Sequence, residues 1–254
     1  MASNKIVPSC YVYFFLLNLY YQIKQKKVPQ LEFVQISRHI YKLTYKTVVG
    51  IPVKINTWYV LDGESVHIID TGMKDYAHTQ LNIAKSLGIP KSILLTHGHL
   101  DHINGAKYLR DNLNIPIYAH EVEAPFINGE KPYPNKAEKE TTGVEHQVES
   151  LSNNIIKKLP VDVYLTPGHT PGHVIYHHKD DNVLLTGDLF FSNAESLHPP
   201  IRKFTVDMGE NINSGRIIDK IKPSIISSSH GEDVKYNCDL YPIYKFIYEE
   251  EGEK

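Results

Sequence analysis

The stretch Thr96-His97-Gly98-His99-Leu100-Asp101-His102 places three imidazoles and one carboxylate within six residues. It follows a short apolar run, residues 92–95, that is typical of a buried strand. Helical side chains meet three or four positions apart, so the alternation of His97 and His99 indicates an extended or looping backbone. Zinc favours imidazole nitrogen and carboxylate oxygen as ligands, and iron or manganese accepts the same set. We therefore predict a metal-binding loop that can supply two neighbouring ions.

Three further candidate ligands also follow β-like runs. His169 lies within Thr166-Pro167-Gly168-His169-Thr170-Pro171-Gly172-His173, where two prolines and two glycines favour a tight loop. Asp188 and His230 each come after a short run with strand character. Strand ends at one edge of α/β layers converge, so these side chains are expected to meet. One tetrahedral ion needs fewer ligands than this, whereas two ions that share Asp188 would use all seven. The predicted ligands are His97, His99, Asp101, His102, His169, Asp188 and His230.

Polar residues next to these ligands have more than one interpretation. Asp70 ends a β-like run, so its carboxylate either caps the helix predicted over residues 76–87 or orients a metal-binding histidine. His173 either supports a neighbouring ligand or is structural. His177 and His178 are adjacent in a predicted strand and thus lie on opposite faces, and we interpret both as sheet residues.

The composition is that of a globular protein with nearly balanced charge. The chain of 254 residues is long enough to bury a substantial core, and we favour one domain over residues 31–254. The chain has 27 basic and 29 acidic residues, so its net charge is close to zero. The overall electrostatic field therefore does not indicate nucleic acid or an anionic membrane as a partner. The two cysteines, Cys10 and Cys238, form no CxxC pair, which favours a reducing, cytoplasmic location, although one disulfide between them stays open.

Hydrophobic periodicity predicts alternating strands and helices, with Asp62-Gly63 as a hairpin signal. The order strand, helix, strand around residues 92–119 is typical of α/β layers. Residues 121–150 are irregular and form either a lid or a linker, and Phe126 and Tyr133 within them could roof a site. The predicted strands are 33–36, 40–44, 55–61, 66–69, 92–95, 115–119, 161–165, 174–178, 182–186 and 224–229, and the predicted helices are 76–87, 103–113, 213–221 and 241–248.

Residues 1–30 differ from the rest of the chain. Residues 11–21 are aromatic and aliphatic, and Lys24, Lys26 and Lys27 follow them. The apolar run is shorter than the about 20 residues of a spanning helix, and it lacks the cleavage site of a secretory signal. Three interpretations stay open: an extra helix packed on the domain, an anchor that contacts a membrane surface, and an extension with no role in the fold.

The ordered motifs resemble those of the metallo-β-lactamase superfamily of metal-dependent hydrolases. The resemblance rests on the loop at 96–102, the loop at 166–173, Gly187-Asp188 and His230-Gly231, with Asp70-Thr71-Gly72 upstream, and it covers roughly residues 31–248. It implies a four-layer αββα sandwich of two mixed β-sheets with outer helices. It also implies one ion on His97, His99 and His169, a second on Asp101, His102 and His230, and Asp188 bound to both.

The same resemblance implies the reaction. A water or hydroxide between two divalent ions, with zinc the first choice, is the nucleophile, and Asp101 can orient it and pass a proton to the leaving group. True β-lactamases of the superfamily generally have cysteine or serine where this chain has Asp188, which argues against an antibiotic-degrading role. Glyoxalase II-type thioesterases add a C-terminal domain, for which the residues after His230 leave no room. Several quorum-quenching lactonases have a tyrosine at the position of Phe191, so lactone activity is in doubt.

We therefore expect a hydrolase of a small ester, lactone or thioester, with Phe190 or Phe191 lining the substrate pocket. A phosphodiesterase or nuclease of the same fold, a mononuclear iron persulfide dioxygenase, and a pseudo-enzyme that binds metal only for stability remain alternatives. The expected partner is a small molecule and no nucleic acid. The sequence leaves the oligomeric state open.

Overall fold

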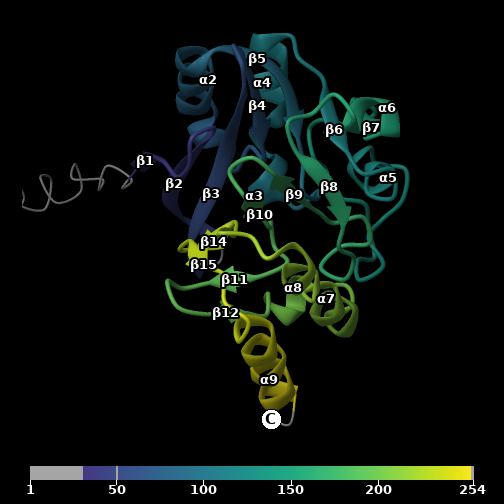
Figure 1. Cartoon of the computed structure of the whole chain (residues 1–254). Helices are drawn as coiled ribbons and strands as arrows, with labels where there is room; N and C mark the ends of the chain where they lie inside the picture. The colour runs from purple at the N-terminus through teal and green to yellow at the C-terminus, as the bar shows by residue number, and fades with distance from the viewer. Residues whose placement is uncertain (1–30, 50, 253–254) are drawn as a thin grey trace, which may run out of the picture.

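The computed structural model describes residues 31–49 and 51–252 (Figure 1). The three interpretations of residues 1–30, and any pairing of Cys10, concern residues outside this range. Cys238 is exposed and is paired with no cysteine of residues 31–49 and 51–252. Within the described part of the chain, no helix is both long enough and apolar enough to cross a bilayer.

The first sheet has seven strands that follow one another in chain order. β1 to β4 pair antiparallel, and β4 to β7 pair parallel. The predicted turn at Asp62-Gly63 joins β3 to β4, and Gly63 has a φ of 58°, which glycine adopts without steric cost. The strands are β1 Leu31–Gln35, β2 Ile40–Val49, β3 Ile51–Asp62, β4 Ser65–Ile69, β5 Ile89–Leu94, β6 Ile117–Ala119 and β7 Val148–Ser150.

The second sheet has five strands in the order β15-β13-β10-β9-β8. β10 and β13 are parallel, and the other neighbours are antiparallel, so both large sheets are mixed. A small sheet, β12-β11-β14, lies beside the ends of the second sheet. The strands are β8 Asp162–Leu165, β9 Val174–His178, β10 Val183–Leu185, β11 Phe191–Ser192, β12 Leu197–His198, β13 Ile225–Ser227, β14 His230–Gly231 and β15 Val234–Lys235.

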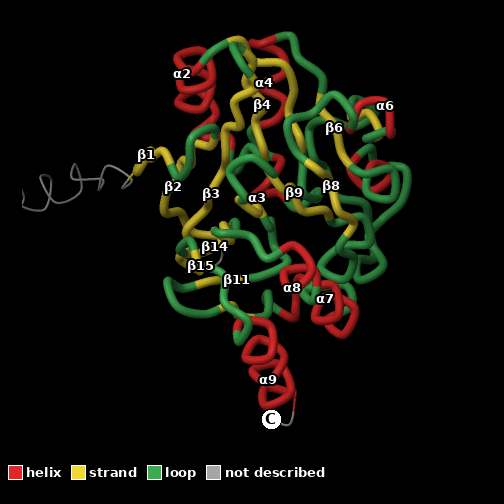
Figure 2. The backbone as a smooth tube through the Cα atoms, viewed as in Figure 1, coloured by secondary structure: helices red, strands yellow, loops and turns green. Residues whose placement is uncertain are grey.

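Helices cover the outer faces of the two large sheets (Figure 2). α2 and α4 pack against the first sheet through a buried cluster that includes Leu81 and Leu109. α7 and α8 pack against the second sheet, and α9 packs against β12 of the small sheet, through a cluster that includes Ile218 and Tyr244. The helices are η1 Lys74–Tyr76, α2 Ala77–Leu87, α3 Leu100–Ile103, α4 Ala106–Leu113, α5 Ala124–Ile127, α6 Asn153–Ile156, η2 Arg202–Phe204, α7 Met208–Ser214, α8 Ile217–Ile221 and α9 Leu240–Gly252.

The two sheets face each other across a third buried cluster, which contains Trp58 and Leu94 from the first sheet and Val174 and Leu185 from the second. Burying one indole removes roughly 150–250 Å² from water, which favours folding by about 4–6 kcal/mol before the loss of chain entropy. The Trp58 Nε1 donates a hydrogen bond of 2.9 Å to the Ser227 hydroxyl and thereby links the sheets. This layering confirms the predicted αββα sandwich.

Three local predictions were inexact. The helix predicted over 103–113 begins later, at Ala106 of α4, because Ile103 ends the separate short helix α3 and residues 104–105 form a turn. The helix predicted over 213–221 is divided between α7 and α8, with Gly215 next to the break. Residues 121–150 contain α5 and β7, so this segment is part of the domain and not a structureless linker.

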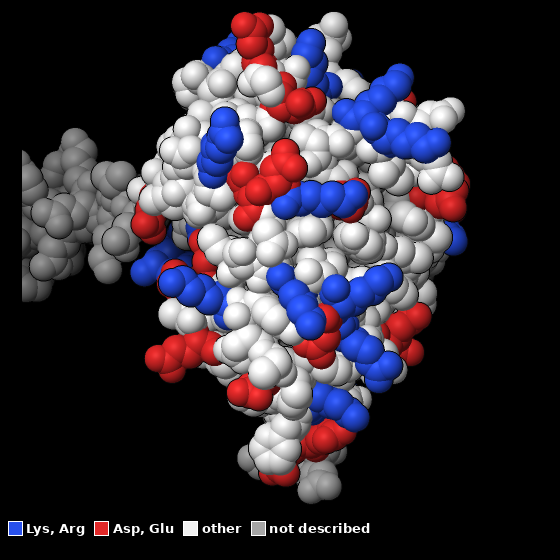
Figure 3. Space-filling view, in the orientation of Figure 1, with Lys and Arg blue, Asp and Glu red and all other residues white. Residues whose placement is uncertain are grey.

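Charged side chains of both signs are interspersed over the face shown in Figure 3. This distribution matches the near balance of the composition. The prediction that nucleic acid is not a partner stays a prediction.

Candidate metal centre

Four strand ends bring all seven predicted ligands to one place. His97 and His99 lie in the loop after β5, and α3 carries Asp101 and His102. His169 lies in the loop between β8 and β9, Asp188 follows β10, and His230 begins β14. Within the described residues, groups of these side chains have ligand atoms within 4.8 Å of one another.

The first group consists of His97, His99 and His169. His99 Nδ1 and His169 Nε2 are 3.0 Å apart. The ring of His97 lies 4.6 Å from that of His99 and 4.8 Å from that of His169. Three imidazoles therefore face one point, as a tetrahedral ion with a further open position requires.

The second group consists of Asp101, His102 and His230. His230 Nε2 is 3.3 Å from Asp101 Oδ2, and His102 Nε2 is 3.8 Å from Asp101 Oδ1. Asp188 lies between the groups: its Oδ1 is 3.3 Å from both His102 Nε2 and His230 Nε2, and its Oδ2 is 3.4 Å from His169 Nε2. Asp188 is thus placed to touch both positions.

Hydrogen bonds from outside the cluster orient His97 and His102. His102 Nδ1 donates to Asp70 Oδ2 at 2.8 Å. Thr96 Oγ1 donates to the same oxygen at 2.7 Å, so it accepts from His97 Nδ1 at 3.1 Å. In both rings Nε2 is therefore the nitrogen that faces the centre. Of the two interpretations of Asp70, the structure favours support of a histidine, because no side chain caps α2.

Two more histidines have the same arrangement. His230 Nδ1 donates to the backbone carbonyl of Lys54 at 2.7 Å. His169 Nδ1 donates to Thr205 Oγ1 at 3.1 Å, since that hydroxyl donates its own proton to the Ile201 carbonyl. Four histidines thus turn Nε2 toward the same volume.

The polar atoms at the centre fit bound cations. His97 Nε2, His102 Nε2 and Asp188 Oδ1 are buried and make no hydrogen bond of acceptable geometry within residues 31–49 and 51–252. Buried polar atoms normally have hydrogen-bond partners, so three unpartnered atoms at one point indicate that they bind a cation. Burial holds the pKa of His97 and His169 well below the usual value, which leaves these rings neutral and able to bind a metal.

The carboxylates give the second position a strong preference for positive charge. Burial alone would lower the pKa of His230, but Asp188 and Asp101 reverse the effect and raise it to about 10. Burial would raise the pKa of Asp101, but His102 and His230 lower it to about 2. The carboxylates thus remain ionised at neutral pH and attract a cation.

His173 positions Asp188 and does not reach the cluster as a ligand. Its Nε2 accepts the backbone N–H of Asp188 at 3.1 Å, and its Nδ1 pairs with Thr166 Oγ1 at 2.9 Å. Gly187 precedes Asp188 with a φ of 53°, and a Cβ there would lie 2.7 Å from His173 Nε2. Only glycine allows this close approach.

Glu123 is a site residue that the sequence analysis missed. Its buried carboxylate accepts hydrogen bonds from the backbone N–H of Gly98 and the hydroxyl of Tyr133 on one oxygen, and from Thr170 and Gly172 on the other. Burial raises its pKa, and these donors oppose that shift. Glu123 therefore ties the loop of His97 and His99 to the loop of His169. Its position soon after β6 repeats the strand-end pattern, and that was the available signal.

A cavity of about 200 Å³ opens on the centre. Its apolar wall includes Phe191, whose ring lies 4.8 Å from that of His230. The prediction for Phe190 was wrong, because Phe190 is fully buried and packs edge to face on Tyr244. Adjacent residues in extended backbone point to opposite sides, so only one of the two phenylalanines faces the cavity. The remaining lining residues are Val53, His99, Leu100, Asp101, Lys136, Glu140, His169, Asp188, Ile201, Phe204 and His230.

Comparison with known proteins agrees with this architecture. A family model described as the metallo-beta-lactamase superfamily matches residues 50–230. The chain is 51% identical to the "Probable metallo-hydrolase YybB" of Bacillus subtilis (strain 168), over 84% of this chain and 97% of that protein. It is 28% identical to the "Probable metallo-hydrolase YflN" of the same organism, over 73% of this chain and 84% of that protein.

Solved structures share the fold at low sequence identity. A metallo-beta-lactamase from Pontibacter korlensis aligns with a TM-score of 0.67 and 21% identity, over 87% of this chain and 99% of that one. The metallo-beta-lactamase FIM-1 from Pseudomonas aeruginosa, in its mono-zinc form, aligns with a TM-score of 0.68 and 16% identity, over 90% of this chain and 98% of that one.

The fold and the ligand cluster define a metal-dependent hydrolase. The chain belongs to the metallo-beta-lactamase superfamily.

Replacing Glu123 with Gln should weaken metal binding by roughly 10–100-fold, the usual effect of losing a group that orients the ligands. The amide nitrogen of Gln would face two donors in place of an acceptor, so the two loops would separate. Chelator competition measures the affinity. Glu121→Gln, an exposed change two residues away, is the matched control and should bind metal like the parent. Equal affinity in the parent and in Glu123→Gln would contradict the positioning role.

Proposed function

We propose that residues 31–254 form one domain that hydrolyses small, largely apolar carbonyl compounds (esters, thioesters or lactones) with two divalent metal ions. One observation carries the proposal. Hydrogen bonds to Nδ1 orient four histidines so that their Nε2 atoms converge at one point with two ionised carboxylates, and this point lies on the wall of a partly apolar cavity. Cysteine is scarce, which supports a cytoplasmic location.

The seven ligands divide into two sets of donors that suit zinc, with iron or manganese as alternatives. Two such ions, when bound, lower the pKa of a shared water and polarise a substrate carbonyl oxygen. One ion would be held by His97, His99 and His169, the other by Asp101, His102 and His230, and Asp188 would bind both.

Asp101 is the acid–base residue of this proposal. Its side chain is 19% exposed, against 6% for Asp188, and it lines the cavity where substrate would lie. Asp101 is a carboxylate at neutral pH, so its oxygens can accept a hydrogen bond from the attacking water and, once the two ions have made that water acidic, its proton. The same carboxyl group can then deliver that proton to the leaving oxygen or sulfur.

The cavity lining supports an apolar carbonyl substrate. Val53, Leu100, Phe191, Ile201 and Phe204 provide the apolar part of the lining, next to the candidate ligands. Such a wall binds an acyl or alkyl group, while the polar centre fixes the carbonyl.

The lining offers little to a phosphodiester. Lys136 is the basic side chain of the cavity, and it pairs with Glu140 at 3.1 Å. Arg202 and Lys203 are the next basic residues after Asp188 in sequence, and neither lines the cavity; Arg202 lies over the ring of Tyr248. The complete second set of ligands also disfavours a mononuclear dioxygenase.

A substrate panel tests the proposal with zinc-loaded protein. Small esters, thioesters and lactones should be cleaved at least about 100-fold faster than an activated phosphodiester, with no oxygen uptake on a persulfide. Asp101→Asn should lower kcat by roughly 10²–10⁴-fold, the range for loss of a general acid–base group. Faster cleavage of the phosphodiester would overturn the substrate class, and oxygen uptake would favour the dioxygenase.

Phe191→Tyr should raise kcat/KM for lactones by roughly tenfold, because its hydroxyl would face the substrate carbonyl and could stabilise the developing charge. Phe190→Tyr is the matched control one residue away. It should leave the lactone rate unchanged and lower the free energy of unfolding by about 1–3 kcal/mol, since its hydroxyl would be buried without a partner. If both variants only lose stability, Phe191 does not contact substrate.

A further inference from the structure

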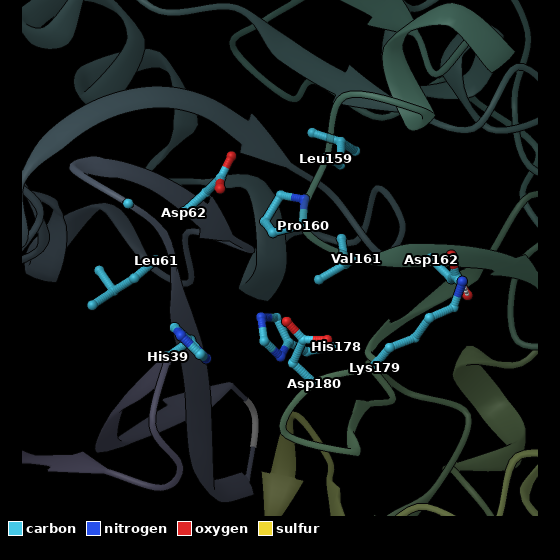
Figure 4. Close-up of a pocket in the computed structure, with 11 residues that line it drawn as sticks. His39, Leu61, Asp62, Leu159, Pro160, Val161, Asp162, His178, Lys179 and Asp180 are labelled. Atoms are coloured by element: carbon cyan, nitrogen blue, oxygen red, sulfur yellow. Dashed lines mark ion pairs between the residues drawn. The ribbon is translucent and has the colours of Figure 1, made fainter.

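A second group of metal-binding residues lies at the opposite end of the strands. β9 runs from the metal centre, where His173 supports Asp188, to His178 at its far end. A cavity of about 320 Å³ opens there, between the turn that precedes β2 and the turn that follows β9. Figure 4 shows His39 and His178 beside each other at this cavity, and their ring centroids are 5.1 Å apart.

Three donor atoms converge beside this cavity, two of them from residues that line it. His39, His178 and Asp181 each offer a ligand atom within 4.8 Å of the other two. His39 Nδ1 lies 2.8 Å from Asp181 Oδ1, and His178 Nδ1 lies 3.8 Å from the same oxygen. Zinc with bonds of about 2.0–2.1 Å has tetrahedral ligands about 3.3 Å from one another, midway between these two distances.

Neighbouring groups already hold the carboxylate in this orientation. Asp181 Oδ2 accepts hydrogen bonds from the Ser37 hydroxyl at 2.6 Å and from the backbone N–H of His39 at 2.7 Å. This leaves Oδ1 for the imidazoles, which is how supporting hydrogen bonds orient metal-binding carboxylates. The side chains of His178 and Asp181 are each 5% exposed, whereas His39 is 29% exposed, so an ion can enter past His39.

The charge around the cavity favours a cation. Asp62, Asp162 and Asp180 line it, and Lys179 pairs with Asp162 at 2.7 Å. Burial lowers the pKa of His178, so its ring is neutral at neutral pH. Its Nδ1 now accepts the backbone N–H of Asp181 at 3.2 Å, and an ion would compete with that contact.

We propose that His39, His178 and Asp181 form a separate site for one divalent transition-metal ion of the zinc type. Two imidazole donors out of three exclude magnesium and calcium, which take oxygen ligands. His39 belongs to the turn between β1 and β2 of the first sheet, while His178 and Asp181 come from β9 and the turn after it in the second sheet. The ion would therefore join the two sheets, and its effect would be on stability and not on catalysis.

Zinc analysis after equilibrium dialysis tests the proposal on the full chain. The parent should bind one more Zn²⁺ per chain than His39→Ala does. Filling this extra position should raise the melting temperature of the parent, whereas the variant should show no such rise. His39→Gln, which retains a hydrogen-bonding side chain, is the second variant if His39→Ala folds poorly. His78→Ala, an exposed change on α2, is the matched control and should behave like the parent.

Replacing Zn²⁺ with Mg²⁺ should give no extra ion. Ester hydrolysis by His39→Ala should equal that of the parent, because His39 lies at the far end of the sheets. The test measures a difference of one ion between parent and variant. The metal centre at the other end is the same in both proteins, so this difference does not depend on whether that centre holds one ion or two. Equal zinc content and equal thermal shifts in the parent and in the folded His39 variants would overturn the proposal.

Discussion

The buried carboxylate of Asp70 is the group on which the rest of the metal centre depends. It accepts hydrogen bonds from the backbone N–H and the hydroxyl of Thr96 and from the ring of His102. A fully buried carboxylate lowers the stability of the fold unless such donors compensate the loss of hydration. The position of Asp70 therefore fixes the positions of Thr96 and His102. The backbone N–H of Asp70 donates to the backbone carbonyl of Leu94, and this hydrogen bond joins the ends of β4 and β5. One side chain thus couples the packing of the first sheet to the orientation of the histidines.

The two mixed sheets then bring residues that are distant in the chain to this point. Trp58 and its hydrogen bond to Ser227 connect the sheets, and the loops after β5, β8, β10 and β13 meet at one edge of the sandwich. Glu123 adds a direct link between two of these loops. The opposite edge carries the cavity of His39 and His178, where contacts through Asp181 again connect the two sheets. Polar contacts therefore connect parts of the two sheets at both ends of the domain, and apolar side chains pack between the sheets.

The sequence was sufficient to predict the layers and the convergence of the seven candidate ligands, because strand-end histidines and carboxylates are visible as local patterns. It could not separate Phe190 from Phe191, since the orientation of Phe190 and Phe191 depends on where the two-residue strand β11 begins, and so short a strand has no alternating pattern. It missed Glu123, whose role arises from contacts with Gly98 and Gly172 that are distant in sequence. The start of α4 was also misplaced, because apolar residues continue at helical spacing from Ile103 across the turn at residues 104–105.

The central claim is that two ions bind between these loops, and anomalous X-ray diffraction from crystals of the zinc-loaded protein tests it most directly. Data collected on either side of the zinc absorption edge should give two peaks in the centre. The first should lie within bonding distance of His97, His99 and His169, the second within bonding distance of Asp101, His102 and His230, and Asp188 should contact both. A single peak at full zinc loading, or peaks away from these side chains, would contradict the account.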